Sequence, residues 1–300
     1  MKPQLPSFSI IIPTHSRPAQ LVSCLNAIAR LDYPRECFEV VVVDDGSPAP
    51  PEDVIASFRA RIEVKLLVQQ RGGPAAARNT GAACAMGEFL VFTDDDCMPE
   101  RNWLRAFAAR FLATPERLVG GRTLNALPEN LYSATSQAII DVVYEHFNTG
   151  DGALFFASNN FAVPAKGFHK VGGFDETFIT SEDREFCDRW AHQGYCMTYA
   201  PEVLNYHAHP LTFRTLWHQH FGYGRGAFRF HRARRLRDGA RIEPDPRFYF
   251  KLLSYPSCTE KGRRALVLTA LVCWTQLASS AGFVREIVTR DGLSKESAAH

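Results

Sequence analysis

The segment FLVFTDDDCMP, residues 89–99, runs from a short apolar stretch into three consecutive aspartates and ends at a proline. Residues 89–93 are expected to form a strand that is buried on both faces, as in a parallel sheet. Adjacent carboxylates repel one another, and they cost stability unless a cation or several hydrogen-bond donors neutralise them. The segment therefore predicts a neutralising partner at the end of a buried strand.

Apolar runs rich in β-branched residues alternate with helical patterns along the first hundred residues, as βαβ units require. The expected strands are residues 8–14, 38–43, 64–68 and 89–93, and the expected helices cover about 17–30, 52–60 and 74–86. Pro99 is expected to open a further helix at its first position. This order predicts half of an open α/β sheet, in which ligands bind beyond the carboxyl ends of the strands.

Two of the expected strand ends carry aspartates that would face one cleft. Asp44 and Asp45 end the segment VVVVDDGS, residues 40–47, and Asp94, Asp95 and Asp96 follow the strand at 89–93. No GxxxxGK motif and no strand-linked GxGxxG motif occurs. Oxygen ligands in a D-x-D arrangement suit Mg²⁺ or Mn²⁺, and such an ion commonly bridges carboxylates to a diphosphate. Capping of a following helix would explain one of the three aspartates well and all three poorly.

Six motifs together resemble a family 2 glycosyltransferase with the GT-A fold, over residues 9–226. They are IIPTHSR (11–17), VVVDDGS (41–47), GGPAAARNTGA (72–82), FTDDDCMP (92–99), GGFDETF (172–178) and SEDREFCDRW (181–190). The resemblance implies a Rossmann-like, open and mostly parallel α/β sheet flanked by helices. It divides the chain into a glycosyltransferase domain at 1–226, with halves at about 1–125 and 126–226, and a helical C-terminal appendage at 227–300.

The resemblance also implies roles for individual residues. It assigns to the nucleotide Pro13, Thr14, Arg17, Asp44, Asp45, Gly73, Arg78, Asp94, Asp95 and Arg225. Asp45 would accept a hydrogen bond from the base, which favours a UDP or dTDP donor over a purine one. Asp95 alternatively only shapes the turn. Arg78 would brace the acidic loop, and Arg225, in the loop HQHFGYGRG between two glycines, would contact the diphosphate.

The metal, Mn²⁺ or Mg²⁺, is assigned by the same resemblance to Asp94, Asp96 and His207. His207 and His209 alternate in LNYHAHP, so both imidazoles would lie on one side of an extended segment, and His207 is favoured. Asn159 and Asn160 either contact the donor or acceptor sugar or satisfy buried backbone groups, and both interpretations stay open.

Helical geometry distinguishes two neighbouring candidate bases, Asp183 and Glu182. If Ser181 caps a helix that continues to about Gln193, Asp183 shares an apolar, inward face with Phe186, Cys187 and Trp190. Glu182 falls on another side together with an exposed pair between Glu185 and Arg189. Asp183 is therefore the predicted base for the acceptor hydroxyl, and we expect nearby positive charges to keep it ionised throughout the neutral range. The alternative is that both acids only favour a helix N-terminus.

The C-terminal region is basic and then apolar. Seven arginines lie between Arg225 and Arg241, and residues 264–284 are largely apolar but diluted by Thr, Gln and Ser. A membrane-spanning helix, an interfacial helix and a buried helical hairpin all fit this pattern. Arginines attract anionic headgroups, and lipid-linked acceptors are common in the family that the chain resembles, so we favour peripheral membrane association over a solvated helix.

Composition narrows the location and the partners. The net charge of +2 gives no reason to expect nucleic acid as a partner. Eight scattered cysteines without a CxxC pair argue against a zinc site or a disulfide framework. The first residues lack the apolar core of a secretion signal. These features predict a cytoplasmic protein, at the cytoplasmic face of the membrane if its C-terminal region binds lipid.

The sequence therefore leads to one principal hypothesis and two alternatives. The principal hypothesis is a metal-dependent, inverting hexosyltransferase that moves a sugar from a nucleotide diphosphate to a hydroxyl of a glycan or lipid-linked acceptor, as in synthesis of cell-envelope polysaccharide. A sugar nucleotidyltransferase would need a glycine-rich, lysine-bearing loop near the N-terminus, and none is found. A noncatalytic nucleotide-sugar or glycan-binding protein of the same fold is the other alternative.

Overall fold

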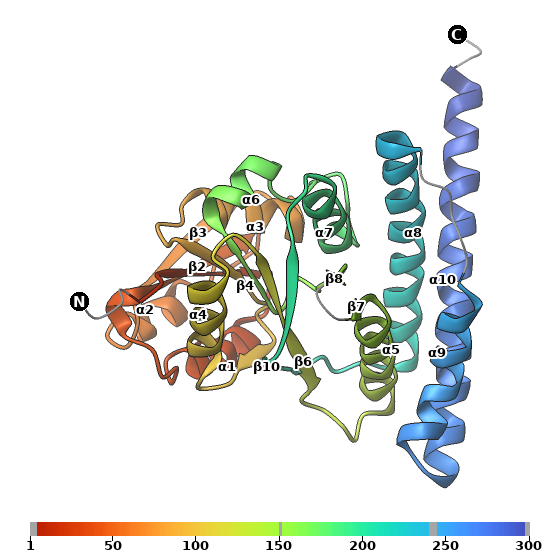
Figure 1. The fold of residues 1–300 in the computed structure, drawn as a ribbon, viewed down its shortest axis with the longest axis horizontal. Helices are drawn as coiled ribbons and strands as arrows, with labels where there is room; N and C mark the ends of the chain where they lie inside the picture. Colours follow the sequence, from red (N-terminus) through yellow and green to blue (C-terminus); the bar gives the residue numbers. More distant parts are fainter. Residues whose placement is uncertain (1–4, 150–151, 240–244, 298–300) are drawn as a thin grey trace. The chain divides into compact units, whose positions relative to one another are not determined.

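The computed structural model describes residues 5–149, 152–239 and 245–297, and Arg241 therefore lies outside the described residues (Figure 1). The chain forms two compact units. Unit 1 comprises Met1–Ala126 and Phe147–Ala208, and unit 2 comprises Leu127–His146 and His209–His300.

Unit 1 is built on an eight-stranded sheet with the order β3-β2-β1-β4-β9-β6-β10-β5. Its strands are β1 (Phe8–Thr14), β2 (Phe38–Asp45), β3 (Val64–Gln69), β4 (Phe89–Phe92), β5 (Cys97–Pro99), β6 (Leu118–Asn125), β9 (Phe161–Pro164) and β10 (Met197–His207). The first four strands pair in parallel, and β6 is parallel to β10. β9 is antiparallel to both β4 and β6, and it joins the two parallel parts. The predicted open, mostly parallel sheet is confirmed.

Helices cover both faces of this sheet, as a parallel sheet requires. They are α1 (Pro18–Ile28), α2 (Glu52–Phe58), α3 (Pro74–Ala83), α4 (Trp103–Ala113), α6 (Ala165–Val171) and α7 (Glu182–His192), with a short 3-10 turn at Arg35–Cys37. Ile10 and Ile12 of β1 join the main core with α1, α2 and α4. Val41 and Val43 of β2 point to the other face and pack on Ala77 of α3. Alternate residues of each strand thus serve opposite layers.

The expectation that Pro99 opens a helix is wrong. Pro99 ends the short strand β5, and α4 begins at Trp103. β5 pairs antiparallel with β10, so that Cys97 lies opposite His207 and Pro99 opposite Asn205. This pairing holds the chain extended after the aspartates, which makes Asp94 to Asp96 a turn between two strands. It also brings the aspartates beside the carboxyl end of β10.

Unit 2 is helical. Its elements are α5 (Leu131–Phe147), whose last residue belongs to unit 1, α8 (Phe213–Asp238), α9 (Pro246–Thr259) and α10 (Gly262–Ser297). One apolar cluster joins Val142 of α5, Leu252 of α9 and Val272 of α10. A small two-stranded sheet, β7 (Asn148–Thr149) with β8 (Gly152–Ala153), belongs to unit 1.

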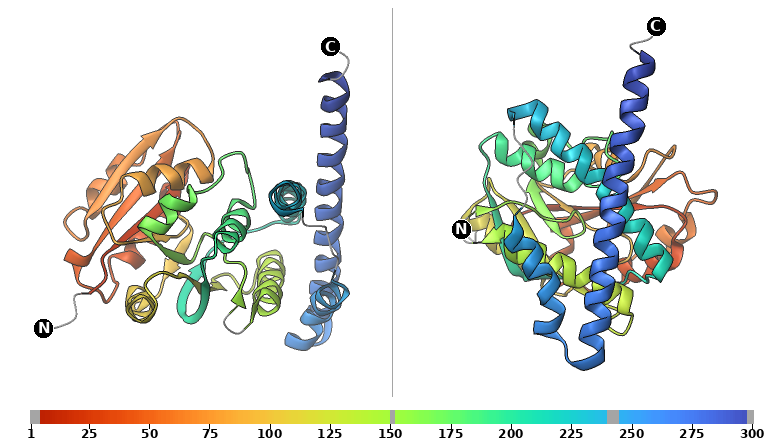
Figure 2. Two further views of the ribbon diagram at one scale, coloured as in Figure 1. Left: turned by 45° about the horizontal axis from the view of Figure 1, so that its top comes forward. Right: turned by 90° about the vertical axis from the view of Figure 1, so that its right-hand side faces the viewer.

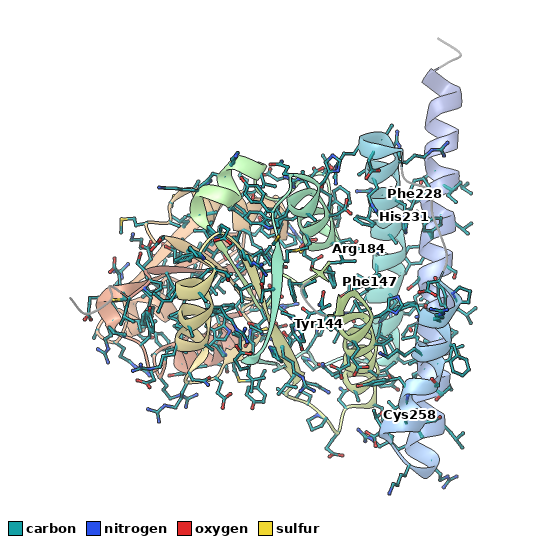
Figure 3. All side chains as sticks on the ribbon, in the orientation of Figure 1. Tyr144, Phe147, Arg184, Phe228, His231 and Cys258 are labelled. Atoms are coloured by element: carbon teal, nitrogen blue, oxygen red, sulfur yellow. The ribbon has the colours of Figure 1, made fainter. Side chains whose placement is uncertain are left out.

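The helices α8 and α10 cross at two glycines. A Cβ atom on Gly224 would lie 1.9 Å from the backbone oxygen of Ser279, and one on Gly282 would lie 2.0 Å from that of Phe221. Phe228 lies on α8 (Figure 3). Its ring meets that of Phe283 on α10 edge to face, with centroids 5.4 Å apart. The segment HQHFGYGRG is therefore the middle of a helix, and the expectation of a loop there is wrong.

The predicted domain boundary at residue 226 falls inside α8, which runs unbroken from Phe213 to Asp238. The compact units instead change at Ala126 and Leu127 and at Ala208 and His209. The predicted extent of the glycosyltransferase domain stays a prediction.

Candidate active site

The acidic turn between β4 and β5 is held by Arg17 and by the end of β1. The hydroxyl of Thr14 donates to Asp95 at 2.7 Å, and the Arg17 guanidinium lies 3.3 Å from Asp95 and 3.2 Å from Asp96. Burial raises the pKa of Asp95 to about 6, against the opposing effects of Thr14 and Arg17. Thr14 and Arg17, predicted at the nucleoside, thus contact the acidic turn directly. Pro13, also predicted there, lies in β1 and is partly buried.

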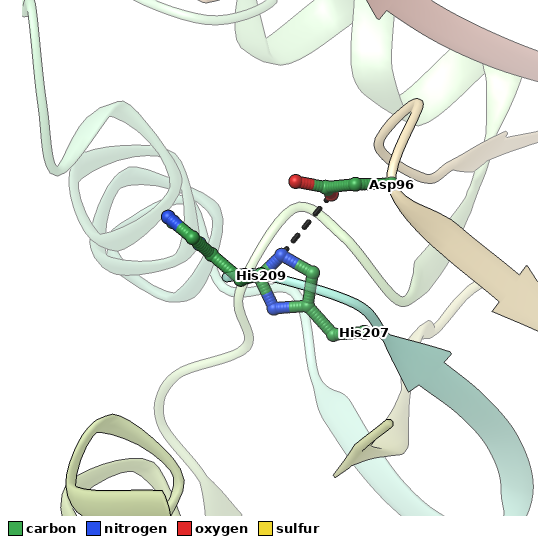
Figure 4. Close-up of side chains that lie close together, drawn as sticks. All are labelled: Asp96, His207 and His209. Carbon is green, nitrogen blue, oxygen red and sulfur yellow. Dashed lines mark ion pairs between the residues drawn. The ribbon is translucent and has the colours of Figure 1, made fainter. Parts of the chain in front are cut away.

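His207 lies beside Asp96, because β5 pairs with β10. Its Nε2 atom is 3.1 Å from a carboxylate oxygen of Asp96 (Figure 4). Burial lowers the pKa of His207, but the hydrogen bond to Asp96 and the neighbouring carboxylates outweigh burial and raise it. One ligand atom each from Asp96, His207 and His209 lies within 4.8 Å of the others. The carboxylate oxygen suits Mg²⁺ or Mn²⁺, whereas the two imidazoles suit a divalent transition-metal ion better than Mg²⁺.

Arg78 of α3 connects the acidic turn to the start of α7. Its guanidinium donates to Asp94 at 2.7 Å and to Glu182 at 2.8 Å, and it lies 5.8 Å from the centroid of the Phe174 ring. Arg78 is 3% exposed and Glu182 7% exposed, so their ion pair forms away from bulk water, whereas Asp94 is partly exposed. Bracing of the acidic loop by Arg78 was predicted. The ion pair between Arg78 and Glu182 was not predicted, because nothing in the motifs around these two residues shows that their side chains meet.

Asp183 lies in the first turn of α7, whose bounds match the predicted helix. Its carboxylate accepts hydrogen bonds from the backbone N–H groups of Ser158 at 3.2 Å and Arg184 at 2.7 Å. Burial raises the pKa of Asp183 to about 7, and Glu182 adds to this, while the two N–H groups and Arg78 oppose it. Among the chain's own groups burial outweighs the opposing charges, so the structure does not support the expectation that positive charges keep Asp183 ionised throughout the neutral range.

The predicted exposed side of α7 is also buried. Glu182 is 7% and Glu185 3% exposed. Glu185 pairs with Arg189 at 2.7 Å, and Arg189 also donates to the backbone oxygens of Val171 and Gly173. Helix α7 therefore packs on two sides, because the turn that follows α6 covers the face that helical periodicity alone left open. Ser181 precedes the helix but makes no side-chain cap.

The end of β2 is tied to the loop before α3. Asp44 is fully buried, and its carboxylate accepts hydrogen bonds from the backbone N–H and the hydroxyl of Ser47. Asp45 accepts from the N–H groups of Gly72 at 2.7 Å and Gly73 at 2.9 Å and from Gln69. Burial alone would raise the pKa of Asp45, but these hydrogen bonds lower it. Gly73 has φ +89°, a backbone conformation that favours glycine. Recognition of the base by Asp45 stays a prediction.

Asn160 has a structural role. Its oxygen accepts from the Trp103 indole at 2.8 Å, and its nitrogen donates to the backbone oxygens of Arg122 and Val203, each at 3.0 Å. It is fully buried, so the interpretation that it satisfies buried groups holds and a sugar contact does not. Asn159 is partly buried and accepts from Thr123.

The predicted diphosphate contact of Arg225 is not supported. Arg225 lies on α8 and pairs at 2.8 Å with Glu286 of α10, which is 3% exposed. The flanking Gly224, which suggested close approach to a ligand, permits close approach of a helix.

Two contributors to the site escaped the sequence-based prediction. Asn205 is fully buried and donates to Thr93 at 3.0 Å and to the backbone oxygen of Asn159 at 2.7 Å, which ties β10 to the end of β4. Ser158 contributes only its backbone N–H. A backbone N–H donor cannot be recognised from residue type. An asparagine within an apolar strand can be, because its buried side chain must find hydrogen-bond partners.

Comparison with known proteins identifies the family. The model of glycosyl transferase family 2 matches residues 9–172, more than half of the chain. Glycosyltransferase AglE of Haloferax volcanii is 29% identical over 235 residues, which cover 75% of this chain and 74% of AglE. Validoxylamine A glucosyltransferase of Streptomyces hygroscopicus is 30% identical over 229 residues, which cover 66% of this chain and 54% of that protein.

Solved structures share the fold. The mannosyltransferase PcManGT from Pyrobaculum calidifontis, in complex with GDP-Man and Mn²⁺, has a TM-score of 0.66 at 22% identity, with 95% of this chain and 88% of that chain covered. Staphylococcus aureus TarS with UDP-GlcNAc has a TM-score of 0.55 at 17% identity, with 95% and 92% covered. At these identities the likeness shows a GT-A-like fold. From the family match and this shared fold we conclude that the chain belongs to glycosyl transferase family 2 and is a glycosyltransferase.

Proposed function

We propose that the protein transfers a sugar from a nucleotide diphosphate donor to an acceptor hydroxyl in a single displacement that inverts the anomeric centre. Asp183 is the base. Its carboxylate is partly buried, and its backbone donors Ser158 and Arg184 fix its orientation. A base with a pKa near 7 is half ionised at neutral pH, and it matches a proton acceptor's requirement for a pKa close to the working pH.

A divalent cation, Mn²⁺ or Mg²⁺, fits the acidic turn. Asp96 and His207 would hold it, with His209 and Asp94 as further ligands. When bound, the ion supplies positive charge to the diphosphate leaving group. Arg17 adds charge at the same turn, since it already lies against Asp95 and Asp96.

The donor and the acceptor are proposed more broadly. PcManGT was solved with GDP-Man and TarS with UDP-GlcNAc, so the shared fold accommodates both a purine and a pyrimidine nucleotide. We retain UDP- or dTDP-sugars as the preferred donors, through Asp45, and a glycan or lipid-linked acceptor at the cytoplasmic face of a membrane. The noncatalytic and nucleotidyltransferase alternatives are set aside, because the chain is a glycosyltransferase.

One observation carries the proposal: Arg78 bonds both Asp94 of the acidic turn and Glu182, the residue next to Asp183. The proposed cation site and the proposed base are therefore held in one site by a single buried side chain. The acidic turn alone, or the buried acid of α7 alone, would not distinguish a transferase site from a structural acidic loop.

The test measures nucleotide diphosphate binding by calorimetry with Mn²⁺, with Mg²⁺ and with EDTA. We expect Asp96→Ala to weaken cation-dependent binding at least about tenfold, as loss of a metal-site residue does. Asp32→Ala, which removes an exposed carboxylate paired with Arg105, is the matched control and should bind like the wild type. Equal affinity in EDTA and in Mn²⁺ would contradict the proposed role of the cation.

A further inference from the structure

The α9–α10 hairpin exposes many large apolar side chains, and the surface that they form is here called the outer face. Eight of the eighteen exposed large hydrophobic side chains among the described residues belong to it: Tyr249, Phe250, Leu253, Leu266, Val267, Leu277, Val284 and Val288. The two helices pack against each other, and they lie side by side in both views of Figure 2. A monomeric soluble protein rarely exposes apolar residues at this density without a partner for them.

The outer face is continuous along α10. Leu266, Leu277, Val284 and Val288 follow one another at intervals of eleven, seven and four residues, which places them on one stripe of a helix. No charged residue occurs between Arg264 and Arg285. The uncharged run, residues 265–284, therefore covers about five and a half helical turns.

The opposite face of α10 is committed to α8. Gly224 and Gly282 bring the two helices to backbone contact, and Glu286 pairs at 2.8 Å with Arg225 and with Arg229. By length and composition, Gly262–Thr289 is one helix among the described residues that could cross a membrane. A crossing would require α8 and its arginines either to leave α10 or to enter the hydrocarbon, and both are costly.

The charge of unit 2 complements an anionic surface. Its residues with described side chains include thirteen Lys and Arg against seven Asp and Glu, whereas the whole chain carries a net charge of only +2. Lys261 and Arg263 lie exposed at the turn between α9 and α10, and Arg285 lies exposed near the other end of the stripe. Basic residues at both ends of an apolar helix face favour binding in the headgroup layer of anionic lipid.

We infer that the outer face rests on an anionic bilayer, with α10 lying in the plane of the membrane and not crossing it. This inference deepens the proposal of an acceptor at the cytoplasmic face of a membrane and rests on it. The apolar stripe enters the acyl boundary, while Lys261, Arg263 and Arg285 meet the headgroups.

The experiment is cosedimentation of the full-length protein with vesicles of phosphatidylcholine alone or mixed with phosphatidylglycerol. We expect binding to the anionic vesicles, and a loss of at least about tenfold in partitioning for the triple variant Phe250→Ser, Leu266→Ser, Leu277→Ser, because three large apolar side chains no longer enter the membrane. Leu236→Ser, which removes an equally exposed apolar residue from α8, is the matched control and should bind like the wild type.

Three outcomes would overturn the inference. The first is retention of the protein in membranes after alkaline carbonate extraction, which indicates a spanning helix. The second is equal vesicle binding by the triple variant and the wild type. The third is dimerisation through the outer face without vesicle binding. Calorimetric binding of nucleotide diphosphate, measured without lipid on the same variants, keeps the donor proposal separate. Failure there with intact vesicle binding would count against the proposed transfer reaction and not against the outer face.

Discussion

Asp183 combines two properties that a base for an acceptor hydroxyl needs. Burial makes its negative charge costly, which strengthens its affinity for a proton, while Ser158 and Arg184 hold its oxygens in a fixed orientation. Glu182, next to it, is instead engaged by Arg78. Two neighbouring acids in one helical turn therefore have different partners, which is why we propose different roles for them.

We expect Asp183→Asn to lower kcat by at least about 100-fold, the low end for loss of a general base. Because the pKa of Asp183 is raised to about 7 and the base acts when ionised, wild-type kcat/KM should rise with pH through that region. Steady-state rates from pH 5.5 to 8.5 measure both effects.

Glu182→Gln should lower kcat less than Asp183→Asn does, because the amide oxygen still accepts a hydrogen bond from Arg78. A greater loss at Glu182 than at Asp183, with donor affinity intact, would reverse the assignment.

Arg78→Met should destabilise the protein by about 3–5 kcal/mol, the usual effect of removing one partner of a buried ion pair. The reason is that Glu182 would keep its charge in a buried position with no counter-charge. Urea unfolding measures the change. The double variant Arg78→Met, Glu182→Gln should recover part of the loss, whereas additive losses in the two variants would show that the pair contributes little.

At the scale of the elements, the crossing of α8 and α10 depends on glycine. We expect Gly224→Ala to lower stability by about 1–3 kcal/mol, the usual effect of overpacking, although alanine is the better helix former. The added methyl group would lie 1.9 Å from the backbone oxygen of Ser279, so the helices would have to move apart. Urea unfolding is the measurement, with Ala281→Val on the exposed side of α10 as the control. Unchanged stability of Gly224→Ala would mean that the crossing adjusts freely.

The elements also show how far sequence reasoning reaches. The strands β1 to β4 and the bounds of α7 could be predicted, because each rests on a local pattern of apolar residues. Pro99 was misplaced because its extended conformation comes from pairing with β10, more than a hundred residues away. The burial of Glu185 was missed for a similar reason, since it depends on which segment covers α7.

The same distinction between local pattern and distant neighbours applies to the site residues. Asp96 and His207 were chosen from motifs, and the structure brings them to 3.1 Å. Arg225 was chosen for its glycine neighbours, yet a glycine permits close approach of any backbone, whether a ligand or a helix approaches. Residue type limits what a position can do, and only its neighbours decide which of those possibilities occurs.

At the scale of the whole molecule, two compact units with separate cores predict two unfolding events. Differential scanning calorimetry should resolve two transitions. A nucleotide diphosphate with Mn²⁺ at a hundredfold over its dissociation constant should add about 2.7 kcal/mol to the unit that binds it. We expect the transition of unit 1 to move more, because Asp45, Asp96 and His207 belong to it, whereas only His209 of the proposed ligands belongs to unit 2. A single transition, or equal shifts of both, would contradict this expectation.

The pairing of β5 with β10 also bears on how the protein is made. The acidic turn leaves the ribosome early, but its imidazole partner His207 follows 111 residues after Asp96. At about 5–20 residues per second, the nascent chain carries an incomplete form of the proposed cation site for roughly five to twenty seconds. The proposed cation would therefore find its full ligand set only in chains in which β10 has already docked on β5.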